Sequence, residues 1–156
     1  EAYESVDWPI IILLGAMIPV GAALETTGGA QLIAELILKA SAQLPPVATL
    51  IIMLVFTMFL SDLVNNAAAV VLTAPIAIRI AQGMDASIDP FLMAITIGAS
   101  CAFLTPIGHQ SNTLVMGPGG YKFGDYWRMG LILEIIVLVV AIPLIMIFWP
   151  LHIRGI

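Results

Sequence analysis

The sequence predicts an all-α membrane protein in which transmembrane helices are combined with a re-entrant helical hairpin and a broken helix. Three observations lead to this fold class. The 156-residue chain is 61% hydrophobic and only 10% charged, with a mean hydropathy of +1.09, whereas soluble domains carry about 25% charged residues. One apolar run is long enough to cross a bilayer. The other apolar runs are short or interrupted by polar residues, Gly or Pro, and we expect a multi-pass protein of the cell (inner) membrane.

Charge and composition exclude several classes of function. The net charge of −5 and the absence of a basic stretch argue against a nucleic-acid partner, which requires clustered Lys and Arg. Cys101 is the single cysteine, and His109 and His152 lie far apart in the sequence, so no metal cluster is expected. Neither a nucleophile motif nor a phosphate-binding loop is present. We therefore expect neither an enzyme nor a cofactor-binding protein.

The sequence predicts two membrane-spanning helices and one surface helix. Residues 128–151 form an apolar run of the required length, about 20 residues or more, with a predicted kink at Pro143. Residues 9–28 form a shorter run that contains Pro19 and ends at Gly28-Gly29. Residues 30–44 alternate apolar and polar side chains at helical spacing, which predicts a helix along the membrane surface or an ordinary connector between spans.

Residues 46–81 predict a re-entrant hairpin. Two apolar arms, 47–60 and 67–80, have 14 residues each, and each is too short to cross the bilayer alone. Between them lies a polar cluster of Ser61, Asp62, Asn65 and Asn66. The alternative is a pair of long bent spans whose polar residues lie at the membrane surface.

Residues 90–118 predict a broken helix. The apolar run 90–104 gives way to Thr-Pro-Ile-Gly-His-Gln-Ser-Asn-Thr at 105–113, and a short apolar piece precedes Gly117-Pro118. Such a segment enters the membrane, unwinds and continues briefly. Paired apolar segments interrupted by Gly or Pro are typical of the binding sites of transporters.

The two polar clusters, 61–66 and 105–113, indicate a transport site. Unpaired polar groups in hydrocarbon cost several kcal/mol each, so the clusters are expected to face one another or a water-filled cavity. Carbonyl and amide oxygens suit Na⁺, whereas hydroxyl and N–H groups suit an anion. The alternative is that these residues only join helices by hydrogen bonds.

Ionisable groups within apolar sequence are functional candidates. Asp62 is a candidate proton or cation ligand, or it pairs with a positive group such as Arg79. We expect it to cap or brace the hairpin. Glu134 lies near the start of the last span. His109 is either a proton relay or, as we favour, a hydrogen-bonded structural residue.

The sequence resembles a known transporter family at both clusters. Ser-Asp-Leu-Val-Asn-Asn-Ala-Ala-Ala at 61–69, with Ala74-Pro75-Ile76, resembles the outward hairpin of the divalent anion/sodium symporter family, and residues 104–113 with Gly117-Pro118-Gly119-Gly120 resemble its unwound helix. The resemblance implies the C-terminal repeat of an inverted-repeat bacterial permease that carries a small anion of the sulfate or dicarboxylate class, coupled to Na⁺ or H⁺. It also implies an N-terminal repeat as partner, a homodimer and a lipid bilayer. A Na⁺/H⁺ antiporter or arsenite-type permease of the same superfamily is the alternative.

The resemblance also assigns site residues. Asn65, Asn66 and Ala67 take the places of the family's Ser, Asn and Thr. The loss of both hydroxyls favours a small inorganic oxyanion such as sulfate over a dicarboxylate, or a relative that uses another coupling ion. The implied substrate-binding residues are Asn65, Asn66, Ala67, Gln110, Ser111, Asn112 and Thr113. The implied cation-binding residues are Ser61, Asp62, Asn66, Thr105, Pro106 and Gly108.

Overall fold

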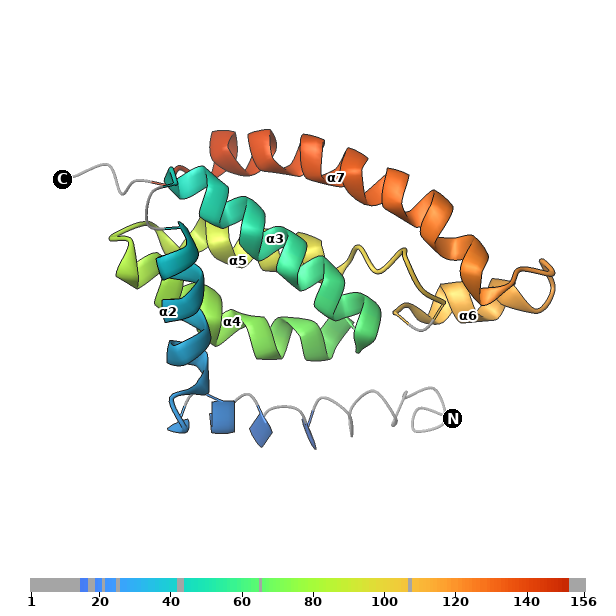
Figure 1. Cartoon of the computed structure of the whole chain (residues 1–156), viewed down its shortest axis with the longest axis horizontal. Coiled ribbons are helices and arrows are strands. Elements are labelled where there is room, and N and C mark those ends of the chain that lie inside the picture. The colour runs from blue at the N-terminus through green and yellow to red at the C-terminus, as the bar shows by residue number, and fades with distance from the viewer. Residues whose placement is uncertain are drawn as a thin grey trace, which may run out of the picture.

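A computed structural model describes residues 15–16, 19–20, 22–24, 26–41, 44–64, 66–106 and 108–151. These residues form helices and connecting turns and contain no strand, which confirms the all-α class. Half of the predicted first span, 9–28, lies outside the described residues. The elements are α2 (Gly29–Ser41), α3 (Pro46–Leu63), α4 (Asn66–Gly83), α5 (Ile88–Ala99), α6 (Gln110–Met116), the 3₁₀ helix η1 (Phe123–Asp125) and α7 (Tyr126–Phe148) (Figure 1).

Helices α3 and α4 form an antiparallel pair joined by a short tip. Pro46 occupies the first turn of α3, where its missing N–H costs no helical hydrogen bond. At the other end the Val64 N–H donates to the Leu60 carbonyl, and α4 then runs back beside α3 (Figure 1). Each helix has 18 residues and is apolar enough, by length and composition, to cross a membrane. Both helices are therefore longer than the 14-residue apolar arms that the sequence predicts. In α3 the difference arises because the polar Ser61 and Asp62 continue its last turn.

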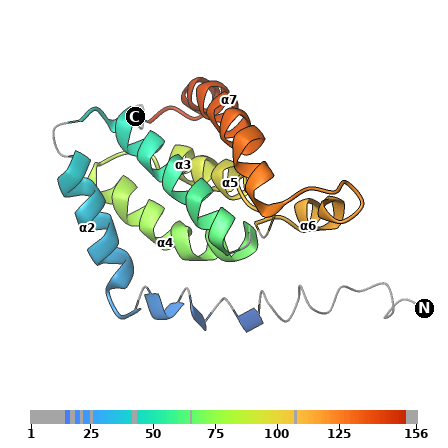
Figure 2. The same cartoon turned by 45° about the vertical axis from the view of Figure 1, so that its right-hand side comes forward.

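The core lies where α5 packs against both α3 and α4. Phe91 and Ile95 of α5 are fully buried there together with Leu50 and Leu54 of α3. A Cβ atom added to Gly98 would lie 2.8 Å from the Leu54 carbonyl oxygen. The absent side chain therefore lets the end of α5 approach α3 closely (Figure 2).

Helix α2 lies across α4, with Ala30 and Ala34 buried against the bundle. Leu32 and Leu36 on its other side are exposed. The surface location expected for residues 30–44 stays a prediction, since it refers to a membrane.

Helix α7 is the long apolar helix expected near the C-terminal end of the sequence. It has 23 residues, contains Pro143, and joins with η1 into a stretch long enough to cross a membrane. Its contacts with the bundle are made to α3 and α5. Most of its apolar side chains, such as Ile132 and Val139, are exposed, which suits a helix that faces lipid or further transmembrane segments.

Candidate functional site

The polar tip of the α3–α4 hairpin contacts the end of α5. Ser61, in the last turn of α3, is fully buried, and its hydroxyl donates to the Ala99 carbonyl at 2.6 Å. The amide of Asn66, at the start of α4, lies 3.0 Å from the Ala99 carbonyl, 3.2 Å from the Gly108 carbonyl and 3.0 Å from the Ser61 hydroxyl. All three neighbours accept hydrogen bonds when the amide nitrogen faces them. The tip is thereby bonded to both ends of the break between α5 and α6.

A second set of bonds joins Asp62 to the break. The Leu104 N–H donates to Asp62 Oδ1 at 3.0 Å. The Thr105 hydroxyl donates to the Asp62 backbone carbonyl at 2.9 Å and accepts from the Gly108 N–H at 3.1 Å. A Cβ atom on Gly108 would lie 2.6 Å from Ala102 Cβ and 3.1 Å from Asp62 Cα. Only glycine therefore allows the break to lie this close to the tip.

Side chains of α6 satisfy further backbone groups of the break. The Asn112 amide donates to the carbonyls of Ala102 and Thr105 at 2.9 and 3.1 Å, and the Thr113 hydroxyl donates to the Pro106 carbonyl at 2.6 Å. His109 Nδ1 accepts from the Ser111 N–H at 3.1 Å and so caps α6. These side chains hold the unwound chain in shape, and the capping bond is the structural role that we favoured for the histidine.

The predicted approach of the two polar clusters is therefore observed. Five of the residues assigned to cation binding meet at the tip and the break, namely Ser61, Asp62, Asn66, Thr105 and Gly108. The sixth, Pro106, is buried beside them, and its carbonyl accepts a hydrogen bond from Thr113. Of those assigned to substrate, Ala67 is half-buried and Ser111 is exposed, whereas the side-chain donors of Asn112 and Thr113 are engaged by backbone carbonyls. Asn65 and the side chain of Gln110 lie outside the described part of the structure.

Glu134 is a site residue that the sequence did not identify. It enters from α7, and its carboxyl group faces that of Asp62 within hydrogen-bonding reach. The Phe103 N–H, which donates to the Cys101 carbonyl at 3.1 Å, also lies near the Glu134 carboxyl group. The partners of Asp62 are thus Glu134 and residues of the break rather than Arg79, which lies thirteen residues beyond Asn66, about 20 Å along α4 at 1.5 Å per residue. The signal available in the sequence was that Glu134 is an acid within an apolar span. Its partner Asp62 lies 72 residues away, so the sequence contained no indication of the contact.

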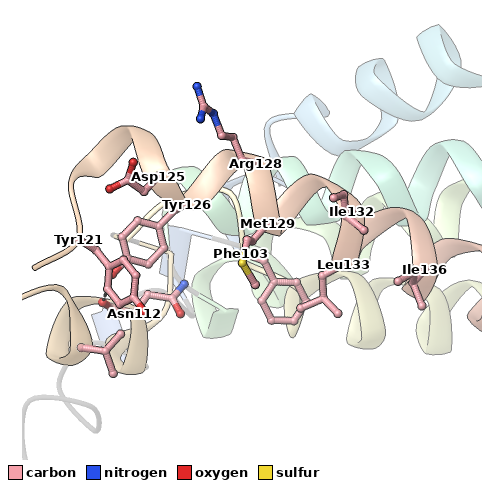
Figure 3. Close-up of a pocket in the computed structure, with 12 residues that line it drawn as sticks. Phe103, Asn112, Tyr121, Asp125, Tyr126, Arg128, Met129, Ile132, Leu133 and Ile136 are labelled. Atoms are coloured by element: carbon pink, nitrogen blue, oxygen red, sulfur yellow. Dashed lines mark hydrogen bonds between the residues drawn. The ribbon is translucent and has the colours of Figure 1, made fainter. Parts of the chain in front are cut away.

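A cavity lies beside this site. It encloses about 700 Å³ between Phe103, α6, η1 and the first turns of α7. Figure 3 shows Tyr121, Tyr126 and Asn112 at one end and Met129, Leu133 and Ile136 at the other, while the Arg128 guanidinium points away. The Tyr126 hydroxyl donates to the Asn112 carbonyl at 2.8 Å. The lining is mainly apolar, so this cavity offers little to an inorganic anion.

Comparison with known proteins places the chain in a family. The sequence profile of a family described as citrate transporter matches residues 1–154. The chain belongs to the citrate transporter family. Relatives of this citrate transporter family member include an uncharacterized transporter of Synechocystis, 39% identical over 93% of the chain, and one of Escherichia coli, 38% identical over 96%. Sodium/sulfate cotransporter 2 of Chlamydomonas reinhardtii is 31% identical over 90% of the chain and matches across 16% of its own length.

These relatives confirm the resemblance to divalent anion/sodium symporters, and with three candidate spans the family member is a multi-pass membrane protein. Their names describe transporters rather than enzymes. The chain spans about a quarter of the length of the Synechocystis and Escherichia coli relatives, 24% and 25% respectively.

We expect Thr105→Val to destabilise the complete protein. The substitution keeps the shape of the side chain but leaves the Asp62 carbonyl and the Gly108 N–H without the hydroxyl that joins them. A buried polar group left unpaired costs about 1–3 kcal/mol. Thermal unfolding in detergent measures the effect. Thr96→Val is the matched control, since that exposed hydroxyl bonds only within its own helix, to the Leu92 carbonyl. Equal midpoints for the two variants would contradict the role given to Thr105.

Proposed function

We propose that this chain supplies one half of the transport site of a secondary active transporter for a small anion of the sulfate or dicarboxylate class, coupled to Na⁺ or H⁺. The observation that carries the proposal is the bonding of a polar hairpin tip to a helix break by Ser61, Asp62, Asn66 and Thr105. Unwound backbone at membrane depth is tolerated where it is buried in protein or lines a water-filled cavity. The family membership and the relative named a sodium/sulfate cotransporter support the same substrate class.

We place the coupled cation beside Asn66. The carbonyl oxygens of Ala99 and Gly108 and the Ser61 hydroxyl converge on one end of its amide. With its nitrogen toward them, the amide donates to these oxygens. Turned over, the amide presents its own oxygen as a fourth ligand, and oxygen ligands are what a hard cation such as Na⁺ prefers. Exchange of one state for the other links cation binding to the conformation of the tip.

We place the anion next to this cation, where its charge is compensated. Ser111 is exposed at the start of α6 and Ala67 follows Asn66 on α4. The methyl group of Ala67 offers no hydrogen bond, which favours sulfate or another small inorganic oxyanion over a dicarboxylate. The remaining ligands come from another part of the complete protein, for which we propose an N-terminal repeat, in a homodimer of the inner membrane.

A second candidate function is a proton-coupled antiporter or an arsenite-type permease. It is favoured by one observation, the contact between the carboxyl groups of Asp62 and Glu134, each of which has a buried oxygen without a hydrogen-bond partner among the described residues. Uptake of labelled sulfate, succinate and arsenite into vesicles, with and without a Na⁺ gradient, distinguishes the candidates. Sulfate or succinate uptake driven by either gradient supports the symporter. Arsenite uptake alone, or cation exchange without anion uptake, supports the second candidate.

We predict that the α3–α4 hairpin is re-entrant, so that both of its outer ends lie on the same membrane face. Pro45 and Gln82 are exposed at these ends. In a complete protein whose Cys101 is replaced by Ala, single cysteines at the two positions should react with a membrane-impermeant maleimide from the same side. Labelling from opposite sides would refute the hairpin and favour two full spans.

Asn66→Ala should abolish coupled anion uptake while leaving membrane insertion unchanged. The substitution removes the amide that three oxygens of the tip and the break surround, and one lost amide barely alters the apolarity of α4. The measurement is initial uptake of labelled anion in vesicles, corrected for protein content. Gln82→Ala is the control because it removes an exposed amide at the far end of the same helix. Wild-type uptake by Asn66→Ala would remove the cation from this position.

A further inference from the structure

Two carboxyl groups meet in the interior of the protein, one from the hairpin tip and one from α7. Asp62 is only 3% exposed. Its Oδ1 accepts the Leu104 N–H, whereas its buried Oδ2 finds no donor among the described residues, and the same holds for the buried Oε1 of Glu134. The two side chains lie within hydrogen-bonding reach of each other. Each carboxyl group therefore has an unpaired oxygen and the other carboxyl group as its neighbour.

A hydrogen bond between these two carboxyl groups requires a proton on one of them. An ionised carboxylate only accepts hydrogen bonds, so two carboxylates cannot bond to each other, whereas one added proton turns either group into a donor. Two like charges in a buried site also repel strongly. The Leu104 N–H, which donates to Asp62 Oδ1 at 3.0 Å, stabilises the single negative charge that remains, and the backbone of Phe103 and Thr105 lies close to the pair.

We propose that Asp62 and Glu134 form a proton-binding site in which the two carboxyl groups share one proton. The proton joins three parts of the molecule, namely the tip of α3, the break at 103–105 and α7. Its removal leaves two negative charges in contact and loosens this junction. Proton binding rests on the geometry alone, and only its effect on uptake rests on the proposed function.

Among the described residues of the surrounding elements, the other charged or titratable groups leave the pair without a close counter-charge. The Cys101 thiol lies in the neighbourhood of both carboxyl groups. In α5 the titratable residue is Asp89, in the first turn at the opposite end from the break, and α4 contributes Arg79 near its far end. Arg128 lies six residues before Glu134 on α7 and points away from the cavity (Figure 3). Helix α6 contains no titratable residue, and its cap His109 is engaged with Ser111.

Infrared difference spectroscopy of the complete protein in lipid vesicles, titrated from acidic to alkaline pH, tests the proposal. The wild type should lose the carbonyl stretch of a buried protonated carboxyl as the pH rises. Glu134→Gln and Asp62→Asn should each lack this band, because either change removes one partner of the shared proton while an amide keeps the shape. Asp89→Asn, which alters an exposed carboxyl group, should retain it.

A wild type without the band, or a band that persists in Glu134→Gln or in Asp62→Asn, would overturn the proposal. Thermal unfolding gives a second measurement that requires no variant to fold. The midpoint of the wild type should fall as the pH rises through the loss of the band, and constancy of the midpoint would also contradict the proposal. Neither measurement involves substrate or an ion gradient. Failure of the anion-transport proposal would therefore leave both results unaffected.

In transport, the shared proton should make uptake depend on pH. Anion uptake by the wild type should decline as the band is lost, whereas the uptake that Asp62→Asn supports, at whatever level, should have a flat pH profile because an amide does not exchange a proton. A pH profile of Asp62→Asn identical to that of the wild type would overturn the proposed link between the proton and the junction.

Discussion

Peptide groups that leave the helical ladder inside an apolar chain must find new hydrogen-bond partners, and the structure between α5 and α6 depends on this requirement. Each unpaired group at such a position costs several kcal/mol. Here the carbonyls of Ala99 and Thr105 and the N–H groups of Leu104 and Gly108 all find side chains from other elements or from nearby in the break. The polar residues of an otherwise apolar sequence are therefore concentrated where the backbone is unwound.

This arrangement couples segments that are distant in the sequence. Some of the side chains that satisfy the break come from the hairpin tip, so the tip and the break cannot separate without breaking these bonds. Gly98 and Gly108 permit the close approach because a Cβ at either position would collide with α3 or with Ala102. Under the proposed function, a cation that reorients Asn66 exchanges bonds on both segments at once, which is how ion binding can prepare an anion site. The Asp62–Glu134 pair extends the same junction to α7.

Composition and periodicity were sufficient to predict the all-α class, the long apolar helix around Glu134, and the meeting of the two polar clusters. The lengths of α3 and α4 were not predictable from apolar runs, because Ser61 and Asp62 continue α3 once their side chains are paired, and α4 includes the polar Asn66 and Gln82. The same limit applies to Asn112 and Thr113, which looked like substrate ligands but bond to backbone carbonyls. Which polar group pairs with which is decided by tertiary packing, and the contact of Asp62 with Glu134 across 72 residues has no local signal.

Hydrogen exchange in the break, followed by mass spectrometry on the complete protein in lipid, tests most directly whether the hairpin tip and the break form one stable hydrogen-bonded junction. Amides that are bonded to a stable junction open only with that junction. The account predicts that residues 100–106 and 108–109, although not helical, exchange as slowly as α5. It also predicts that Asp62→Ala accelerates exchange there while the far half of α4 is unchanged. Rapid exchange of 100–106 and 108–109 in the wild type, or a rate that is unaffected by Asp62→Ala, would contradict it.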